Sequence, residues 1–161
     1  RSILCDPRRP DMKDYLNARV KHREAFRPFA PTVLWSKANE WFEIDPGQPY
    51  SYMLSVVPVL PHRRDQIPAV LHVDDTARIQ TVTHEENPGY WEIVNAFFQQ
   101  TGVPMVLNTS FNLAGKPIVE TPQDALTCFE STEIDVLALG RYLISKRPLA
   151  EYEADRLVLQ H

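Results

Sequence analysis

A polar segment follows an apolar one near residue 108, and its side chains could hydrogen-bond a small polar ligand. Residues 103–107 predict a buried strand, and carboxamides and hydroxyls fill four of the next five positions. Open α/β sheets commonly bind ligands at the carboxyl ends of their strands. Carboxamides and hydroxyls both donate and accept hydrogen bonds, as a group such as –O–C(=O)–NH2 requires. The segment therefore predicts Asn108, Ser110 and Asn112 as ligand-binding residues, or else an Asx-rich turn that satisfies its own backbone.

A second group of candidates is basic. Lys21, Arg23 and Arg27 lie within seven residues, and the prolines that follow exclude a helix, so residues 20–34 are predicted to be extended. Alternate residues of an extended chain share a face, which would project the three cations together. Cations gathered in this way repel one another unless an anion lies between them, and the planar arginine fork suits phosphate oxygens. The segment predicts either a phosphate site or a solvent-exposed basic strand edge.

Arg78 interrupts an otherwise apolar strand pattern and shares its predicted face with Thr76 and Gln80. It is either a further phosphate ligand or the ion-pair partner of Asp74 or Asp75. His72, a few residues upstream, fits a core position as well as a catalytic one. The two aspartates are too weak a signal for a metal site. The sequence contains no zinc-ligand spacing, Gly-rich phosphate loop or nucleophile elbow.

Composition limits the class of protein. With 161 residues the chain is long enough for one domain with a real core, and 43% hydrophobic and 24% charged residues are typical of a folded protein. The net charge of −4 gives no general attraction for nucleic acid or an anionic membrane, so an anion site must be a local group of cations. Cys5 and Cys128 make neither a disulfide framework nor a zinc cluster, which favours a reducing cytoplasm. No apolar stretch approaches the roughly 18 residues that span a bilayer.

Short strands and helices alternate along the chain, which predicts a single α/β or α+β domain with helices packed on a mixed sheet. The strongest helix runs from Asn87 to Gln100, with Pro88 at its first position and Gly102 as its stop. A second helix begins after Thr121, which is a good N-cap. The predicted helices are 11–20 (with Asp11 as N-cap), 36–42, 87–100, 122–131 and a loosely attached 149–161. The predicted strands are 51–59, 69–75 and 76–82 (two strands or one bent one), 103–107, 117–120, 134–139 and 142–145.

The segments MKDYLNARVKHREAFRPFAPTVL, IPAVLHVDDTARIQTV and TGVPMVLNTSFNLAGKPIVETPQDALTCF stand in the order found in a known family. They closely resemble the C-terminal domain of the O-carbamoyltransferases, which include the nodulation-factor, cephamycin and tobramycin carbamoyltransferases. The resemblance runs from residue 1 to about residue 147 and implies a YrdC-like α/β domain, built on a twisted mixed sheet with packed helices. We expect this domain to occupy residues 1–148, followed by a helical or disordered tail at 149–161.

The resemblance also implies an activity in which the domain binds carbamoyl phosphate and ATP, with Mg²⁺ on the nucleotide, and forms carbamoyl adenylate with release of pyrophosphate. An N-terminal domain of the actin/sugar-kinase type, carrying a transition-metal ion, would then transfer the carbamoyl group to a hydroxyl of the acceptor. Lys21 and Arg78 would be the catalytic residues of the activation step. The carbamoyl-phosphate ligands that the family motifs imply are Lys21, Arg27, Arg78, Asn108 and Ser110, with Arg23, Asn112, His72 and Thr76 as neighbours in the site.

The chain departs from the family in one respect, because it begins with Arg1-Ser2, the last two residues of a GPRALGNRS-type loop. An upstream arginine of that loop, expected in the phosphate site, is not in the sequence, and neither is the metal-bearing domain. We therefore expect the chain alone to be unable to carbamoylate an acceptor. The alternatives are a YrdC-like module that binds a nucleotide or RNA without chemistry, and an enzyme similar to threonylcarbamoyl-adenylate synthase. The sequence does not indicate the acceptor.

Overall fold

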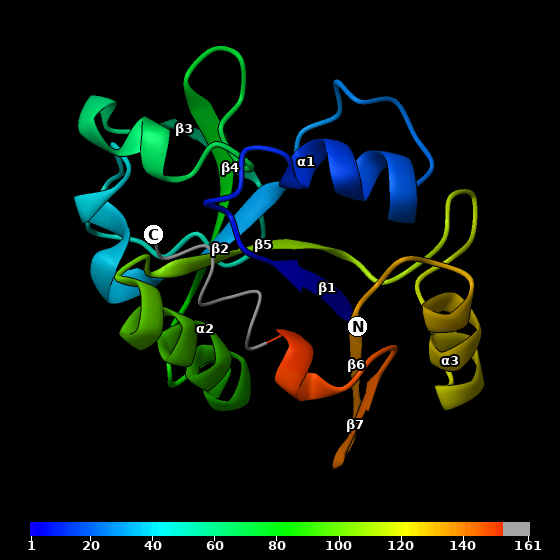
Figure 1. The fold of residues 1–161 in the computed structure, drawn as a ribbon. Helices are drawn as coiled ribbons and strands as arrows, with labels where there is room; N and C mark the ends of the chain where they lie inside the picture. Colours follow the sequence, from blue (N-terminus) through cyan, green and yellow to red (C-terminus); the bar gives the residue numbers. More distant parts are fainter. Residues whose placement is uncertain (153–161) are drawn as a thin grey trace.

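A five-stranded mixed sheet organises the fold, for which a computed structural model describes residues 1–152 (Figure 1). The strand order is β1-β5-β2-β4-β3, in which β2 and β4 are parallel and the other neighbouring pairs are antiparallel. The mixed sheet with packed helices confirms the predicted single α/β domain. The strands are β1 (Ser2–Cys5), β2 (Ala30–Leu34), β3 (Ser55–Pro58), β4 (Thr76–Val82) and β5 (Met105–Ser110).

Helices and a small hairpin complete the described part of the chain. Helix α1 (Met12–Tyr15) continues directly into a π-helical turn (Leu16–Val20), so the predicted helix over 11–20 is present with a widened second half. The predicted tail is helical at 149–152 and otherwise lies outside the described residues, and the domain limit at residue 148 stays a prediction. The other elements are α2 (Pro88–Thr101), α3 (Pro122–Glu130), 3-10 helices at Trp35–Glu40 and Pro61–Gln66, and a hairpin of β6 (Val136–Leu139) and β7 (Tyr142–Ser145).

The two faces of the sheet pack against different helices, because alternate residues of a strand point to opposite sides. On one face, Val33 and Leu107 join the main core, to which α1 contributes its buried side chains. On the other face, Leu34 and Val106 pack against Val94 of α2. Helices α1 and α2 accordingly lie on opposite sides of the sheet (Figure 1).

Helix α2 covers only part of its face of the sheet. Along the strands, the apolar side chains give way to Thr32, Gln80 and Asn108, and then to Arg78 and Ser110. These residues lie two or four positions from residues that contact α2, so all of them belong to the same face. The end of this face that α2 leaves uncovered therefore gathers polar residues that the sequence singled out.

The ends of α2 and α3 follow local sequence signals. Asn87 caps α2 by accepting a hydrogen bond from the backbone N–H of Tyr90 at 3.2 Å, and Gly102 ends the helix in the left-handed region with a φ of 74°. Thr121 and Asp124 form a reciprocal capping box at the start of α3. Both predicted helices are confirmed to within one residue of their expected ends.

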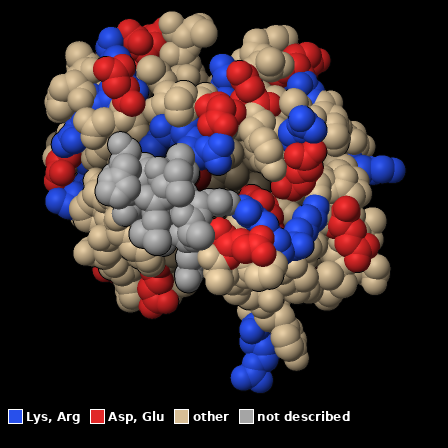
Figure 2. Space-filling view, in the orientation of Figure 1, with Lys and Arg blue, Asp and Glu red and all other residues tan. Residues whose placement is uncertain are grey.

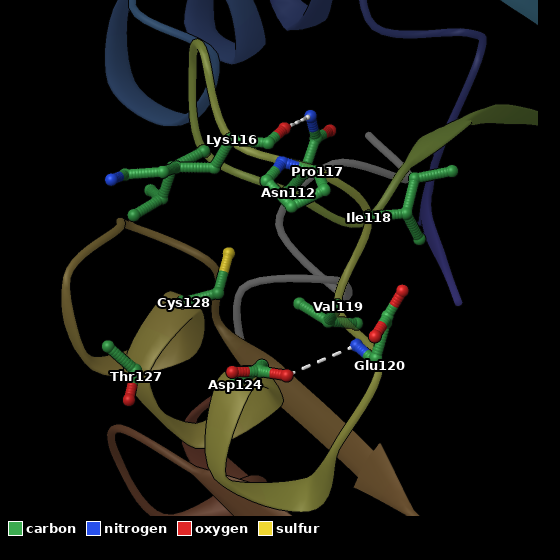
Figure 3. Close-up of a pocket in the computed structure, with 10 residues that line it drawn as sticks. Asn112, Lys116, Pro117, Ile118, Val119, Glu120, Asp124, Thr127 and Cys128 are labelled. Atoms are coloured by element: carbon green, nitrogen blue, oxygen red, sulfur yellow. Dashed lines mark hydrogen bonds between the residues drawn. The ribbon is translucent and has the colours of Figure 1, made fainter.

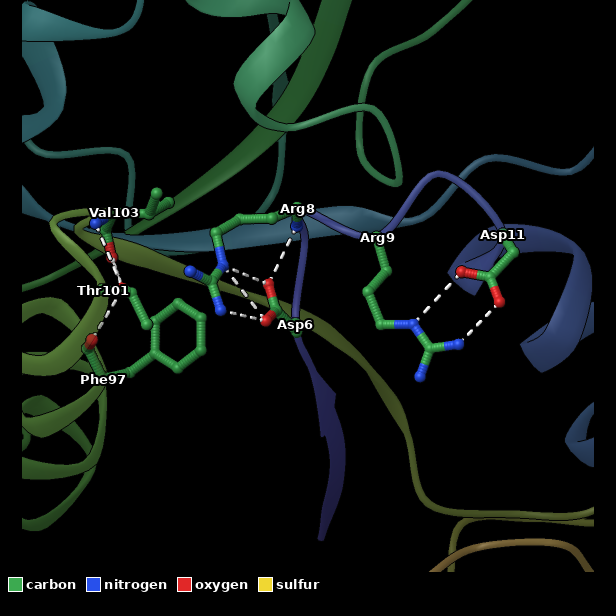
Figure 4. Close-up of polar contacts among 7 residues, drawn as sticks. All are labelled: Asp6, Arg8, Arg9, Asp11, Phe97, Thr101 and Val103. Carbon is green, nitrogen blue, oxygen red and sulfur yellow. Dashed lines mark hydrogen bonds and ion pairs between the residues drawn. The ribbon is translucent and has the colours of Figure 1, made fainter. Parts of the chain in front are cut away.

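Two arginine–aspartate pairs hold the segment between β1 and α1 (Figure 4). Arg8 approaches Asp6 to 2.6 Å and lies 5.6 Å from the centre of the Phe97 ring, which ties this segment to α2. Arg9 donates to both carboxylate oxygens of Asp11, at 3.1 and 2.6 Å. Because its carboxylate is engaged in this pair, Asp11 makes no side-chain cap, and the predicted capping role is wrong.

Several strand predictions are corrected by contacts that are distant in sequence. Strand β5 does not stop before Asn108 but runs to Ser110, because β1 pairs with its last residues, and the sequence did not indicate β1. Residue 20 belongs to the π-helical turn and residues 21–29 contain no strand, so only Ala30–Leu34 is a strand in this region. The strand predicted at 51–59 is shorter and spans Ser55–Pro58, and the segments 69–75 and 117–120 contain no strand. The two strands predicted at 134–139 and 142–145 are confirmed, and they form a hairpin.

Replacing Thr121 with alanine should lower the free energy of unfolding by about 1 kcal/mol, since the N–H of Asp124 loses its acceptor at the start of α3. Urea denaturation measures the change. Thr127→Ala is the matched control, because Thr127 is an exposed position inside the same helix and should leave stability unchanged or slightly raised. Equal effects of the two substitutions would contradict the capping role.

Candidate functional site

The ammonium group of Lys21 lies in a cradle of oxygen atoms at the end of β5. Its Nζ atom is 2.8 Å from Asn112 Oδ1 and 3.1 Å from Ser110 Oγ, and it also contacts the backbone carbonyls of Ser110 and Asn112. The π-helical turn positions Lys21, whose backbone N–H donates to the carbonyl of Leu16 at 2.8 Å. Such turns widen a helix locally and recur at functional sites. Ser110 and Asn112 therefore hydrogen-bond the ammonium group of this lysine and hold it in place.

Lys21 is a buried cation without a counter-ion. Only 4% of the residue is exposed, and no carboxylate of the described residues lies within ion-pair distance. Burial lowers the pKa of Lys21 to about 8, with a further lowering from the charge of Arg23 and an opposing effect of Cys128. Because burial disfavours the charged form, an anion bound here would restore it.

Arg23 adds a second cation beside Lys21. Its Nε atom donates to Asn17 Oδ1 at 2.8 Å, and its guanidinium lies 4.7 Å from the centre of the Phe29 ring. Burial lowers the pKa of Arg23, and the charges of Arg27 and Arg78 lower it further. The mutual repulsion shows that the cations singled out from the sequence share one region. They are Lys21, Arg23, Arg27 and Arg78.

Asn17 explains why these cations come together, and sequence analysis missed it. The side chain is 1% exposed and donates from Nδ2 to the carbonyls of Ala25 and Arg27, at 3.3 and 3.1 Å. These bonds fold the segment after Val20 back toward the helix, where the sequence predicts extended backbone. The signal in the sequence was a polar residue on the apolar face of the first helix.

The other two cations differ in their surroundings. Arg27 is exposed and pairs with Glu24 at 3.0 Å, so it is not engaged with the Lys21 cradle. Arg78 is exposed on β4. The ion pair suggested for Arg78 is wrong, because Asp75 pairs with Arg64 and Asp74 accepts from Thr76. Within residues 1–152, no ion pair or hydrogen bond occupies the Arg78 guanidinium.

A hydrogen-bond chain fixes the orientation of the Asn108 amide. Gln80 donates from Nε2 to the carbonyl of Ser51 at 3.0 Å, which leaves its Oε1 to accept from Thr32 and from Asn108 Nδ2, at 2.8 and 3.1 Å. Asn108 Nδ2 also donates to Thr32 Oγ1 at 3.0 Å. The amide oxygen of Asn108 therefore faces away from this chain, and no donor among the described residues engages it. It is an acceptor of fixed position at the uncovered end of the sheet.

Thr76 is the first residue of β4, and His72 lies in the segment just before it. His72 Nδ1 is 3.2 Å from Thr76 Oγ1, and the other ring nitrogen is buried without a partner in the described part of the chain. His72 lines a surface cavity and is partly exposed, so it is not a core histidine. Burial lowers its pKa, as do the charges of Arg78 and Lys13, against an opposing effect of Asp74.

A largely apolar cavity of about 330 Å³ lies between residues 112–120 and α3 (Figure 3). The Cys128 thiol points from α3 toward the 112–120 segment, and the Asp124 carboxylate accepts from the backbone N–H of Glu120 at 3.3 Å (Figure 3). Asn112 lies both in this cavity and in the Lys21 cradle. Burial raises the pKa of Cys128 and the charge of Lys21 lowers it, so the thiol is close to the ammonium.

The surface carries both charge signs, and the face in Figure 2 shows Lys and Arg side chains beside Asp and Glu. With a net charge of −4, an anion could be attracted only by a local group of cations. Among the described residues, no group of three or more His, Cys, Asp or Glu side chains could hold a metal ion. The helices of residues 1–152 are all too short or too polar to cross a bilayer.

The described residues form an α/β domain in which a buried lysine and neighbouring arginines lie in one region with a neutral amide acceptor of fixed orientation. A family model described as "Carbamoyltransferase C-terminus" matches residues 1–146. The chain therefore belongs to the family of carbamoyltransferase C-terminal domains, which confirms the resemblance drawn from the sequence segments.

Curated relatives agree with this assignment. The chain is 51% identical over 160 residues to nodulation protein NolNO of Sinorhizobium fredii, a match that covers 99% of this chain and 24% of the relative. It is 47% identical over 149 residues to nodulation protein NolO of Bradyrhizobium diazoefficiens, covering 92% of this chain and 27% of the relative. Nodulation protein U of Rhizobium tropici is 40% identical over 151 residues, with coverages of 94% and 25%. The chain thus spans about a quarter of the length of these relatives.

The affinity of the site for an anion should depend on the protonation of Lys21. Its pKa of about 8 in the free protein implies that an anion bound above this pH must bring a proton with it, so the affinity for sulfate should fall as the pH rises from about 7 to 9. Calorimetric titration measures the profile, and sulfate itself keeps its charge over this range. Lys21→Met should weaken binding and remove the pH dependence, whereas an unchanged profile in this variant would contradict the assignment.

Proposed function

We propose that this domain binds carbamoyl phosphate and activates it with ATP to carbamoyl adenylate. The observation that carries the proposal is the buried Lys21 ammonium, which lies beside Arg23 and has no counter-ion among residues 1–152. A bound phosphate group would supply the missing negative charge. Membership of the carbamoyltransferase family supports the choice of a carbamoyl ester over other phosphorylated compounds.

The two ends of carbamoyl phosphate match the two kinds of groups in the site. Lys21, Arg23 and Arg78 would bind the phosphate oxygens, for which guanidinium groups provide paired donors. The free oxygen of Asn108 would accept from the carbamoyl N–H₂ group. Asn108 lies on β5 and Arg78 on β4, with β2 between them. Two strand spacings correspond to about 10 Å between their Cα atoms, which leaves room for a small ligand between the side chains.

The activation step requires positioning and charge stabilisation more than a covalent nucleophile. Overall, carbamoyl phosphate, ATP and one water molecule would give carbamoyl adenylate, pyrophosphate and phosphate. Lys21 and Arg78 would stabilise the charge that shifts between phosphoryl oxygens, and Mg²⁺ would accompany the nucleotide. The nearby thiol of Cys128 is a poor nucleophile, because burial raises its pKa.

Transfer to an acceptor hydroxyl would take place elsewhere in a longer protein or complex. The relatives are about four times as long as the matched part, which supports a separate transferase domain N-terminal to this one. We assign the acceptor pocket, the actin/sugar-kinase-like architecture and the transition-metal ion to that domain. Lys21, Arg23, Arg78 and Asn108 would remain the activation site of this chain.

Binding of carbamoyl phosphate tests the first step. Arg78→Ala should weaken it by roughly 10- to 100-fold, since hydrogen bonds to charged groups contribute about 1.5–3 kcal/mol. Calorimetry with fresh ligand measures this change. Arg141→Ala is the matched control, an exposed arginine in the turn between β6 and β7 that should have no effect. Neither substitution should alter the urea midpoint, because both side chains are exposed.

Incorporation of labelled pyrophosphate into ATP tests the second step. The exchange should require carbamoyl phosphate and fall about 100-fold or more in Arg78→Ala, the usual effect of removing one group that stabilises developing charge. The assay is run with the full chain, alone and with a relative's N-terminal part added. If carbamoyl phosphate neither binds nor supports exchange in either preparation, the proposed function is wrong.

A further inference from the structure

The amide of Asn108 has two orientations of the same shape, and only one of them presents an oxygen atom to a ligand. The orientations exchange the carbonyl oxygen, which accepts hydrogen bonds, with the NH2 group, which donates them. The backbone at this position is fixed, because Asn108 pairs with Leu4 of β1 on one side and with Ala30 of β2 on the other. The contacts of the side-chain amide therefore decide what the site offers to a ligand.

Gln80 on β4 supplies the acceptor that decides between the two orientations. Its Nε2 atom donates to the backbone carbonyl of Ser51 at 3.0 Å, and a carbonyl oxygen can only accept. The Gln80 amide cannot turn around without placing two oxygen atoms against each other. Its Oε1 atom therefore stays in place to accept from Asn108 Nδ2 at 3.1 Å.

The carbonyl of Ser51 is held by contacts on both sides of it. The backbone N–H of Tyr50 donates to Thr81 Oγ1 at 2.7 Å, and the backbone N–H of Thr81 donates to the carbonyl of Tyr50 at 2.8 Å. The Ser51 hydroxyl donates to Glu86 Oε1 at 2.9 Å. The orientation of Gln80 is thus fixed by backbone that is itself bonded to β4.

The Thr32 hydroxyl acts in the same direction. It has a single proton, which it donates to Gln80 Oε1 at 2.8 Å, so toward Asn108 it can only accept, and it does so from Nδ2 at 3.0 Å. Without the Gln80 oxygen, this hydroxyl could either donate to the Asn108 amide or accept from it, and both amide orientations would be available. Gln80 therefore orients Asn108 directly and also through Thr32.

The Asn108 oxygen that results is accessible. No donor among residues 1–152 engages it. It is also not one of the fully buried side-chain atoms without a partner, which in this part of the chain are His72 Nε2 and the Tyr90 hydroxyl oxygen. A ligand that covers this oxygen has to bring a hydrogen-bond donor, because a buried acceptor left unpaired is costly.

We propose that Gln80 is a positioning residue that determines specificity, because it holds the Asn108 oxygen in the orientation that selects a carbamoyl group over an acetyl group. The inference rests on the proposed function, in which carbamoyl phosphate is the ligand. Acetyl phosphate presents the same phosphate and carbonyl groups, but a methyl group replaces the NH2 donor. It would bind the cations equally well and leave the Asn108 oxygen unpaired.

The test compares carbamoyl phosphate, acetyl phosphate and sulfate by calorimetry on the full chain, with freshly dissolved ligands. The wild-type protein should bind carbamoyl phosphate roughly 10- to 100-fold more tightly than acetyl phosphate, the effect of one unpaired acceptor. Gln80→Leu removes the acceptor and should bring the two affinities close together, mainly by weakening carbamoyl phosphate. Its affinity for sulfate should be unchanged, which shows that the fold and the cations are intact.

Two further variants separate orientation from a general effect of substitution. Gln80→Glu keeps oxygen atoms that can accept from Thr32 and Asn108, so it should keep the preference for the carbamoyl group, although its charge weakens all three anions. Gln66→Leu is the matched control, because Gln66 is an exposed glutamine that also donates to a backbone carbonyl, that of His62. It should change none of the affinities.

The proposal is overturned if the wild-type protein binds acetyl phosphate as tightly as carbamoyl phosphate, or if Gln80→Leu keeps the preference. In both cases carbamoyl phosphate still binds, so the proposed function stands. If the wild-type protein binds sulfate but not carbamoyl phosphate, the proposed function is wrong and this inference falls with it.

Discussion

The site depends on one energetically demanding feature, the charge of Lys21 in a nearly closed environment. Taking an ammonium group out of water costs several kcal/mol unless ligands replace the lost solvation. Here Ser110 and Asn112 supply oxygen atoms but no negative charge. Repulsion from Arg23 makes the charge less favourable still. A chain optimised only for stability would place an apolar residue at position 21. A bound anion would make the charge of Lys21 favourable, which accounts for a lysine at this buried position.

The face of the sheet that α2 partly covers carries both packed apolar side chains and the polar residues of the candidate site. Where α2 covers the face, Leu34, Val82 and Val106 pack against it. Two residues further along these strands, Thr32 and Gln80 form a polar boundary whose hydrogen bonds are satisfied within the chain. Satisfied networks of this kind are rigid, because any displaced member leaves an unpaired group in a dry environment. Asn108 is therefore held by the same contacts that end the apolar packing of α2.

The sequence predicted what local signals determine and failed where distant segments decide. Asn87, Gly102 and Thr121 act within one helical turn, and the helices they bound were placed correctly. The sequence predicts too early an end for β5, because the last residues of this strand pair with β1, more than a hundred residues away. The sequence predicts an extended basic segment because its residue types alternate. In the structure, Asn17 donates hydrogen bonds to backbone carbonyls that a neighbouring strand would otherwise need. Arg23 and Asn108 were found by residue type, whereas Asn17, which orients Arg23, and Gln80, which orients Asn108, resemble ordinary polar residues in the sequence.

Selectivity in this site has to come from its neutral groups. Lys21, Arg23 and Arg78 would attract any small phosphorylated compound, since a phosphate presents the same oxygens whatever it is attached to. The Asn108 oxygen would recognise a hydrogen-bond donor, and it is oriented by a hydrogen-bond chain that ends at a group which cannot turn around, the backbone carbonyl of Ser51. A donor lost from the ligand leaves a buried acceptor unpaired, which discriminates more strongly than the loss of an apolar contact. An oriented acceptor beside a group of cations would thus select an amide among many phosphates.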